Sequence, residues 1–394
     1  MSRSFDPLDP HFQVSPYEYY KRLREEPAIF VASLNAWFVG RYKDVRAMSL
    51  EPQTFSNARF SEISKGQFDY APSAAQLIAT DPPVHTRLRT LASQAFRPSR
   101  VRAMEDTIGR ITAQYLDPVV AAGQPFDFHG DLASRIPIHA ITEMLGVPAE
   151  EGQTFRRWTA DILSAANRSA MSPDELAQIR RSVDSARAYF TGVIQQRRGN
   201  LGADMISAWI EAQEKRDVLT DEEILGLAIL LLVGGDTTTA HLLSNTMIAL
   251  WDHPDVLDEV RGDPSLIPRV IEESLRYEPP VQSVFWNTTR DVDVDGVHIP
   301  KDAAVIGVWS SANRDPERFP DPDRFDLHRE SSGHVAFGFG PHFCLGASLA
   351  RAEARIVLEA VFERLPNLKR ADHNPVSWTP SYWIRGPRAL PVAA

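Results

Sequence analysis

The sequence predicts a mainly α-helical protein with a small β-rich portion, folded as one unit. Helical periodicity extends from Asp81 to about Lys215, a long apolar helix covers Asp221–Trp251, and short strand-like runs with turns follow Pro279. No repeat, low-complexity tract or convincing linker divides the 394 residues. Although the length by itself suggests two or three domains, we expect one unit that is large enough to enclose a cavity.

The N-terminal half begins with short elements and continues with helices. A helix is expected over Tyr17–Glu26, and the apolar runs Ala28–Phe30 and Ala36–Val39, joined by a tight connection, predict a small hairpin. Within the helical region, Asp174–Arg198 is long and amphipathic. Residues that commonly end helices recur along this region; they are Pro98, Gly123, Gly146–Pro148, Gly199 and Gly202.

The helix expected over Asp221–Trp251 begins with a capping box, in which Thr220 is the N-cap and Glu223 lies three residues later. Its middle is apolar on every face, so the helix should pass through the interior. The strand-like runs that follow are Val281–Trp286, Val292–Val294, Val297–Ile299 and Ala304–Val308. Proline-rich coil then covers Asp315–Phe325, and a glycine-rich loop leads into a last helix, Leu345–Leu365.

The composition excludes several classes of protein. With 52 acidic and 42 basic residues, the formal charge is −10, which disfavours binding to nucleic acid. One cysteine allows neither an intrachain disulfide nor a multi-cysteine metal site, and this fits the cytosol. Met1–Asp9 lacks the features of a signal peptide, and the apolar stretch Ile224–Gly235 is too short to cross a bilayer. We therefore expect a soluble, cytoplasmic protein without membrane contact.

The clearest candidate for chemistry is the segment Phe337–Gly346, with the sequence FGFGPHFCLG. Its glycines let the backbone turn tightly and approach a flat molecule closely. Cys344 immediately precedes the expected last helix, whose free N–H groups and dipole favour an anion. We therefore expect a lowered thiol pKa and a thiolate that can serve as an axial haem ligand. An inert, buried cysteine is the alternative.

The same segment resembles the haem-binding signature of the cytochrome P-450 family: phenylalanine, two spacers, glycine, spacer, basic residue, spacer, cysteine, spacer, glycine. The resemblance implies the family fold enclosing haem b, with Cys344 as the iron ligand. It also implies that His342 contacts a haem propionate and that Phe337, Gly338 and Gly346 belong to the haem-binding loop.

Three further segments resemble the family in the same order along the chain. Asp81–Arg89 is similar to the start of its C helix; His85 and Arg89, four residues apart, can face one anionic group and by resemblance hold haem propionates. Glu273-Ser-Leu-Arg276 is similar to its Glu-x-x-Arg motif, which implies a structural pair. Asn313–Phe325 is similar to the coil before the haem loop. Solvated surface pairs are the alternative for both pairs of charged residues.

Val233–Ala240 resembles the oxygen-binding segment of the family's I helix. Aligned without gaps through His253, Thr238 falls on the catalytic threonine, and Thr237 stands where an acid is usual. Asp236 lies one residue earlier, about 100° around an ideal helix. A hydroxyl positions water but is a poor proton donor. Either Asp236 reaches the proton relay through a locally distorted helix, which we favour slightly, or water or a substrate group substitutes.

Further resemblance concerns the propionates and the substrate. Trp286 stands where a propionate-binding arginine is usual, so one propionate is held more weakly, Arg290 reaches it, or Trp286 lines the substrate pocket.

The polar segment Asn57–Ala79 resembles part of the substrate lid. Positions implied to face substrate are mainly apolar, which suits a hydrophobic molecule, although ordinary core is the alternative. They are Leu77, Ile78, Val233, Gly234, Thr237, Val284 and Phe285.

The expected partners follow from charge and from the resemblance. Arg87, Arg97, Arg100 and Arg102 cluster in an otherwise acidic chain, either as a solvated helix end or as a docking patch for an acidic electron donor. Too little chain follows Cys344 for a fused reductase. The resemblance therefore implies electrons from NAD(P)H, delivered through a separate reductase and a ferredoxin.

The leading hypothesis is a bacterial-type haem-thiolate monooxygenase that inserts one atom of dioxygen into an apolar natural product, terpenoid or aromatic compound. Because the usual acid is absent at Thr237, the first alternative is oxidative coupling, ring closure, dehydration or peroxide-driven oxidation. The second is a haem protein that binds a ligand without turnover. Hydrolysis by Cys344 and His342 is disfavoured, since no residue is evident to orient the histidine.

Overall fold

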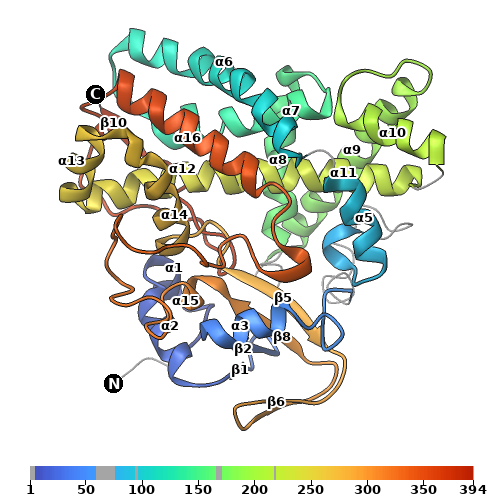
Figure 1. Cartoon of the computed structure of the whole chain (residues 1–394), viewed down its shortest axis with the longest axis vertical. Helices are drawn as coiled ribbons and strands as arrows, with labels where there is room; N and C mark the ends of the chain where they lie inside the picture. Colours follow the sequence, from blue (N-terminus) through green and yellow to red (C-terminus); the bar gives the residue numbers. More distant parts are fainter. Residues whose placement is uncertain (1–4, 59–75, 94–95, 166–170, 217–218, 394) are drawn as a thin grey trace.

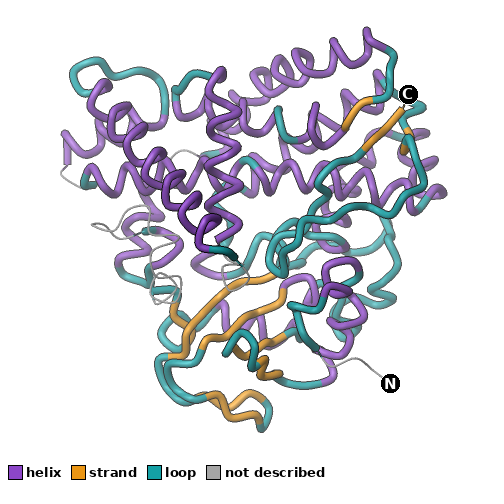
Figure 2. The backbone as a smooth tube through the Cα atoms, turned by 180° about the vertical axis from the view of Figure 1, so that it is seen from behind, coloured by secondary structure: helices purple, strands orange, loops and turns teal. Residues whose placement is uncertain are grey.

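The computed structural model describes residues 5–58, 76–93, 96–165, 171–216 and 219–393. Figure 1 shows a large helical part and a smaller β-rich part, the second built from an N-terminal segment (blue) and a segment of the C-terminal half that contains β5 and β8 (orange). This arrangement confirms the predicted fold class. Seen from behind, the loops gather between the helices and the main sheet (Figure 2).

The helices of the described residues fall into a short N-terminal group, a long central series and a C-terminal group. They are α1 (Pro10–Val14), α2 (Tyr17–Glu25), α3 (Tyr42–Ser49), α5 (Val84–Ser93), α6 (Pro98–Ala122), α7 (Ile136–Leu145), α8 (Gly152–Ser164), α9 (Pro173–Arg197), α10 (Met205–Arg216), α11 (Asp221–Gly235), α12 (Thr237–Asp252), α13 (Pro254–Gly262), α14 (Ile267–Tyr277), α15 (Trp309–Ala312) and α16 (Ala347–Arg364).

The main sheet has five strands in the order β1-β2-β8-β5-β3. Its β2–β8 pair is parallel and its other pairs are antiparallel. Its strands are β1 (Ile29–Val31), β2 (Ala36–Val39), β3 (Phe55–Ser56), β5 (Ser283–Thr288) and β8 (Ala304–Val308). Two smaller sheets contain β4 (Phe126–Asp127), β9 (Lys369–Arg370) and β10 (Pro391–Ala393), and the hairpin of β6 (Val292–Val294) and β7 (Val297–Ile299).

The central helical segment lies in the interior, as its apolar faces predicted. Its N-terminus is closed by the expected capping box, in which Thr220 Oγ1 accepts from Glu223 N and Glu223 Oε2 accepts from Thr220 N. The span Asp221–Asp252 is long and apolar enough to cross a membrane, but 72% of its most apolar window is buried inside the protein. Unlike the single helix expected, it is interrupted at Asp236, which separates α11 from α12.

Three other predicted boundaries are corrected. The first strand begins at Ile29 because its register is set by the antiparallel pairing of Val31 with Ala36. The strand expected over Val281–Trp286 is displaced to Ser283–Thr288, where it pairs with β8 and β3. The last helix begins at Ala347 and not at Leu345, because Gly346 is the N-cap and its carbonyl accepts from the N–H of Ala350.

Candidate active site

The loop around Cys344 is tightly folded at two glycines. Gly338 and Gly340 adopt φ values of 74° and 72°, in the left-handed region that favours glycine. A Cβ atom on Gly340 would lie 2.5 Å from the carbonyl oxygen of Ser49 on α3. The N–H of Cys344 donates to the carbonyl of Phe337 at 2.7 Å and closes the loop. The glycines therefore allow the backbone path that presents Cys344 next to the start of α16.

The electrostatic environment of Cys344 differs from the expectation. Burial raises the pKa of the Cys344 thiol, and the N–H groups of Gly346 and Ala347 together with the charges of Arg89 and Arg351 oppose this rise without overcoming it. The predicted lowering of the pKa is therefore wrong for the protein chain, because loss of water around the sulfur outweighs the helix terminus and the arginines. The same arrangement nevertheless provides hydrogen bonds that would stabilise an anionic sulfur.

His85, Arg89 and His342 come together beside this loop. The imidazole centroids of His85 and His342 are 4.1 Å apart, and the Nε2 atoms of both rings are buried without a hydrogen-bond partner in the described chain. Burial, together with the charges of His85 and Arg89, lowers the pKa of His342 to about 4. Buried imidazole nitrogens without partners, beside a guanidinium, fit a bound anion such as the propionate groups of haem b, whose charge would favour protonated imidazoles.

The structure places Trp286 in the core of the β-rich part. Its side chain is only 4% exposed, and its ring centroid lies 6.2 Å from that of Phe55. It also covers Gly307 on the neighbouring strand, where an added Cβ would lie 2.5 Å from the indole. Arg290 is exposed and donates to Thr54 Oγ1 at 3.2 and 3.3 Å. These contacts favour a packing role for Trp286 over the pocket position considered from the sequence.

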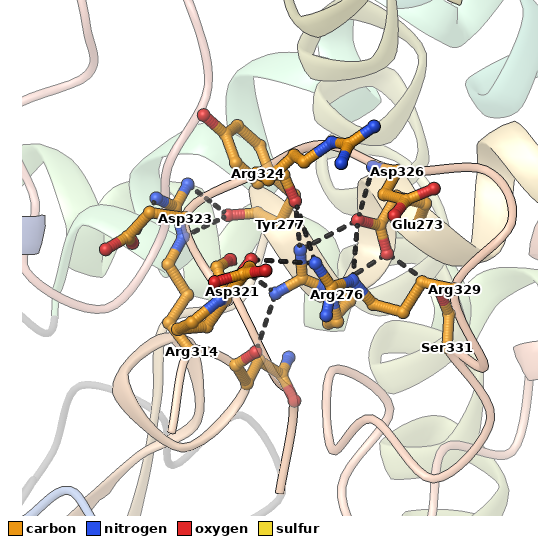
Figure 3. A network of polar contacts seen from close by, with 12 residues as sticks. Glu273, Arg276, Tyr277, Arg314, Asp321, Asp323, Arg324, Asp326, Arg329 and Ser331 are labelled. Carbon is orange, nitrogen blue, oxygen red and sulfur yellow. Dashed lines mark hydrogen bonds and ion pairs between the residues drawn. The ribbon is translucent and has the colours of Figure 1, made fainter. Parts of the chain in front are cut away.

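Glu273 and Arg276 form a fully buried ion pair on α14 (Figure 3). Two hydrogen bonds of 2.8 and 2.7 Å join the side chains, and Arg276 also donates to the carbonyls of Asn313, Pro322 and Arg324. Glu273 in turn accepts from the N–H of Asp326 and the hydroxyl of Ser331. The pair therefore fastens α14 to the coil that precedes the Cys344 loop, and it is not a solvated surface pair.

The break in the central helix lies at the predicted catalytic segment. Asp236 has φ −79° and ψ −82°, and Thr238 Oγ1 donates to the carbonyl of Gly234 across the break at 2.6 Å. A Cβ on Gly234 would meet nothing within 4 Å, whereas one on Gly235 would lie 3.1 Å from Ile141 of α7. Gly234 therefore faces open space, Gly235 makes a close helix contact, and the distortion that we considered for Asp236 is present.

Two buried carboxyl groups lie near this break. Asp236 and Glu353, on α16, are each 3% exposed, and no described residue donates a hydrogen bond to either carboxyl group. Burial raises the pKa of Asp236 to about 7, although the charge of Arg156 opposes the rise. Burial and then the neighbouring Asp236 raise the pKa of Glu353 well above its usual value. Sequence reasoning missed Glu353, because one acidic residue in an amphipathic helix is unremarkable.

A cavity of about 970 Å³ lies between α8, α9, α12 and the C-terminal loop. Asp236 and Thr237 line it, together with Arg156 and His241, which the sequence did not single out. Of the predicted substrate positions, Thr237 is the one that borders this cavity. The other positions lie elsewhere: Leu77 and Val233 are buried in the helical core, and Ile78 is half-buried. Val284 packs in the β core, and Phe285 contacts Tyr382 and Trp383. Most of the proposed lid, residues 59–75, lies outside the described residues.

The arginine cluster is divided by the structure. Arg87 of α5 pairs with the buried Glu223 of α11 and so joins two helices. Arg97, Arg100 and Arg102 are exposed at the start of α6, and their side chains have no partner among the described residues. The part of the cluster that remains available to a partner is therefore the start of α6.

The comparisons with known proteins agree with these features. The family model for cytochrome P-450 matches residues 8–371. The chain is 39% identical to the cytochrome P-450 monooxygenase PikC of Streptomyces venezuelae, covering 98% of this chain and 92% of that protein. It is 34% identical to 6-deoxyerythronolide B hydroxylase of Saccharopolyspora erythraea, with coverage of 97% and 96%.

Among solved structures, the myxobacterial cytochrome P-450 CYP267B1 in complex with myristic acid superposes with a TM-score of 0.91 at 31% identity, covering 98% of each chain. The fold, the ordered motifs and these relatives lead to one assignment. The chain belongs to the cytochrome P-450 family of oxygen-incorporating oxidoreductases.

Proposed function

We propose that this protein is a haem-thiolate monooxygenase that inserts one atom of dioxygen into a largely apolar small molecule. Cys344 would hold the iron, and His85, Arg89 and His342 would hold the propionates of haem b. Electrons would come from NAD(P)H through a ferredoxin and its reductase, in the cytoplasm. When bound, haem supplies the oxygen chemistry, while the protein supplies binding, orientation and protons.

The observation that carries this proposal is that two features lie side by side: donors around the sulfur of Cys344 and buried imidazole nitrogens without partners in the described chain. The sulfur of Cys344 is approached by backbone N–H groups and two arginines, and the imidazoles of His85 and His342 keep buried nitrogens without partners. A ligand with a cationic metal centre and anionic edge groups satisfies both at once. A purely structural cysteine does not explain the orphaned histidines.

Asp236 supports a role in proton delivery. Its carboxyl group lines the cavity, and its raised pKa, about 7, means that it both holds and releases a proton near neutral pH. The Thr238 hydroxyl donates to Gly234 and keeps lone pairs able to accept from water. In this proposal Thr238 orients water at the break, Asp236 supplies protons to it, and Thr237 occupies the position beside them.

The ferrous–carbon monoxide difference spectrum of purified wild-type protein and of Cys344→Ser tests the proposal. We expect a thiolate-type Soret band in the wild type and its loss in the variant, since serine cannot provide the thiolate. Arg269→Gln, at an exposed site on α14, is the control and should retain the band. Absence of haem, or a band unchanged by Cys344→Ser, would contradict the assignment of the ligand.

The unusual position of the acid favours testing a second reaction class, namely coupling, ring closure or dehydration without oxygen insertion. Thr237 occupies the usual acid position, and Asp236 acts from a break in the helix. Turnover under isotopically labelled dioxygen separates the classes. We expect one labelled oxygen atom in the product, whereas an unlabelled product would support the second class.

A further inference from the structure

In the cavity beside Asp236, some charged side chains have hydrogen-bond partners within the described chain and others do not. The cavity volume, about 970 Å³, is at the upper end of the range for small-molecule sites. Its acidic residues outside the break already have partners in the protein. Asp161 accepts hydrogen bonds from Gln178 and Ser182, and Glu175 completes the capping box of α9 with Ser172.

Arg156 differs from these acids. It lies on α8, lines the cavity and is half-buried, yet its guanidinium has no acceptor among the described residues. Its charge acts on the cavity interior, because it lowers the pKa of both His129 and Asp236 and so favours the neutral imidazole and the ionised carboxylate. A guanidinium carries five N–H donors in a planar arrangement that matches a carboxylate. The cavity therefore contains a cationic group whose N–H donors have no acceptor in the described part of the chain.

A second polar group in the same cavity also lacks a partner. His241, on α12 one turn after Thr237, is 4% exposed, and its Nδ1 atom is buried without a hydrogen bond in the described chain. Its ring has little freedom to turn away, because an added Cβ on Gly386 would lie 2.1 Å from it. A fixed imidazole nitrogen and a guanidinium without an acceptor in the described chain thus border one cavity, where both could bind a polar group of a ligand.

The surrounding residues favour an anionic ligand over a cationic one. Arg157 and Arg388 also line the cavity and are exposed, so basic side chains surround its approach. An ammonium group placed beside Arg156 would meet like charge. Ile179 and Ile384 supply apolar surface on the same cavity. The combination suits a molecule that has an apolar body and one negatively charged group.

We propose that the substrate carries a carboxylate, which pairs with Arg156, and that its apolar body extends along the cavity past Asp236 and Thr237. This inference rests on the proposed function, since it names the substrate class of the same site. It makes Arg156 a specificity-determining residue: the carboxylate fixes which carbon lies near the break in the central helix.

The test uses haem-loaded protein and the spin-state shift that ligands cause on binding. The probes are dodecanoic acid, tetradecanoic acid and 3-phenylpropanoic acid, each compared with its own methyl ester. We expect at least one acid to bind the wild type about tenfold or more tightly than its ester, as the loss of one charged hydrogen-bonded pair predicts. Arg156→Gln should remove this preference, whereas Arg180→Gln, exposed on α9 outside the cavity, should keep it.

The outcomes are distinguishable from those for the proposed function. A normal ferrous–carbon monoxide spectrum in Arg156→Gln shows that this variant folds and holds haem. With that spectrum intact, equal binding of acids and esters, no binding of any probe, or an acid preference that survives Arg156→Gln would overturn the inference. Loss of the spectrum in wild-type protein would instead contradict the proposed function. Higher ionic strength should also weaken acid binding more than ester binding.

Discussion

Buried charges differ in two regions of the molecule. On α14, Glu273 and Arg276 are fully buried and every charged atom has partners. Beside the break in the central helix, Asp236 and Glu353 are equally buried but have no donor in the described chain, and Arg156 has no acceptor. The first arrangement stabilises one geometry. The second leaves groups whose protonation or pairing can still change.

The physical reason is the cost of removing charge from water. A buried ion is tolerated when hydrogen bonds replace its hydration, and the Glu273–Arg276 pair achieves this with four backbone groups and one hydroxyl. Asp236 lacks such replacement, so the folded protein shifts its pKa to about 7. Unpaired buried groups of this kind concentrate at functional sites.

The largest effect is expected from breaking the paired region. Glu273→Gln leaves the Arg276 guanidinium buried beside a neutral amide, which should reduce the free energy of unfolding by about 3–5 kcal/mol. Chemical denaturation monitored by circular dichroism, together with the haem content after purification, measures this loss. Glu25→Gln removes an exposed partner of Arg22 and should cost less than about 1 kcal/mol. If both variants lost a similar free energy of unfolding, the distinction between the buried Glu273–Arg276 pair and exposed ion pairs would be contradicted.

The next effect concerns the unpaired region. Asp236→Asn cannot release a proton, so product formed per dioxygen consumed should fall about tenfold or more. Measurement of product, NAD(P)H and dioxygen gives this coupling ratio, with Asp184→Asn, exposed on α9, as the control. Because the acid must be protonated, wild-type coupling should decline as pH rises through about 7. Unchanged coupling in Asp236→Asn would exclude this residue from proton delivery.

The same substitution, Asp236→Asn, lowers coupling but should raise the stability of the folded protein relative to the wild type at neutral pH. The folded pKa of Asp236, about 7, lies above its ordinary value of 3.8, so the folded protein binds this proton more tightly than the unfolded chain does. Wild-type stability should therefore fall relative to Asp236→Asn as pH rises from about 4 to about 7, and the difference should then remain constant. We expect a change on the order of 4 kcal/mol in the unfolding free energy between pH 4 and pH 8. A pH-independent difference would contradict the raised pKa.

The smallest effect is expected at the arginines near the start of α6, where exposed arginines are compared with the paired Arg87. Arg97→Glu should slow reduction by a ferredoxin a few-fold at low salt, and the difference should shrink as salt is added. Stopped-flow reduction measures this rate, with Arg180→Glu on α9 as the control. Arg87→Gln should instead lower stability, since it removes the pair with Glu223. Reduction that is indifferent to both salt and Arg97→Glu would leave the exposed arginines without a docking role.

Local patterns in the sequence predicted much of the fold and the surroundings of Cys344. Short strand-like runs placed β2, β6, β7 and β8 at the observed bounds, and the capping box placed the start of α11. Spacing along one helix placed Glu273 beside Arg276. These predictions succeeded because each depends on residues that are close in sequence, where geometry is set by helix or strand repeat.

Other properties depend on residues that are distant in sequence. The chain alone established the family, the lone cysteine, the order of the motifs and the displaced acid at Asp236. Only the tertiary structure determined that Trp286 is core, that Glu353 lies within electrostatic reach of Asp236 and that the Arg156 guanidinium has no acceptor among the described residues. Burial and pairing decide the cost and the pKa of a charge, and both are set by which segments meet in the folded protein rather than by the local sequence.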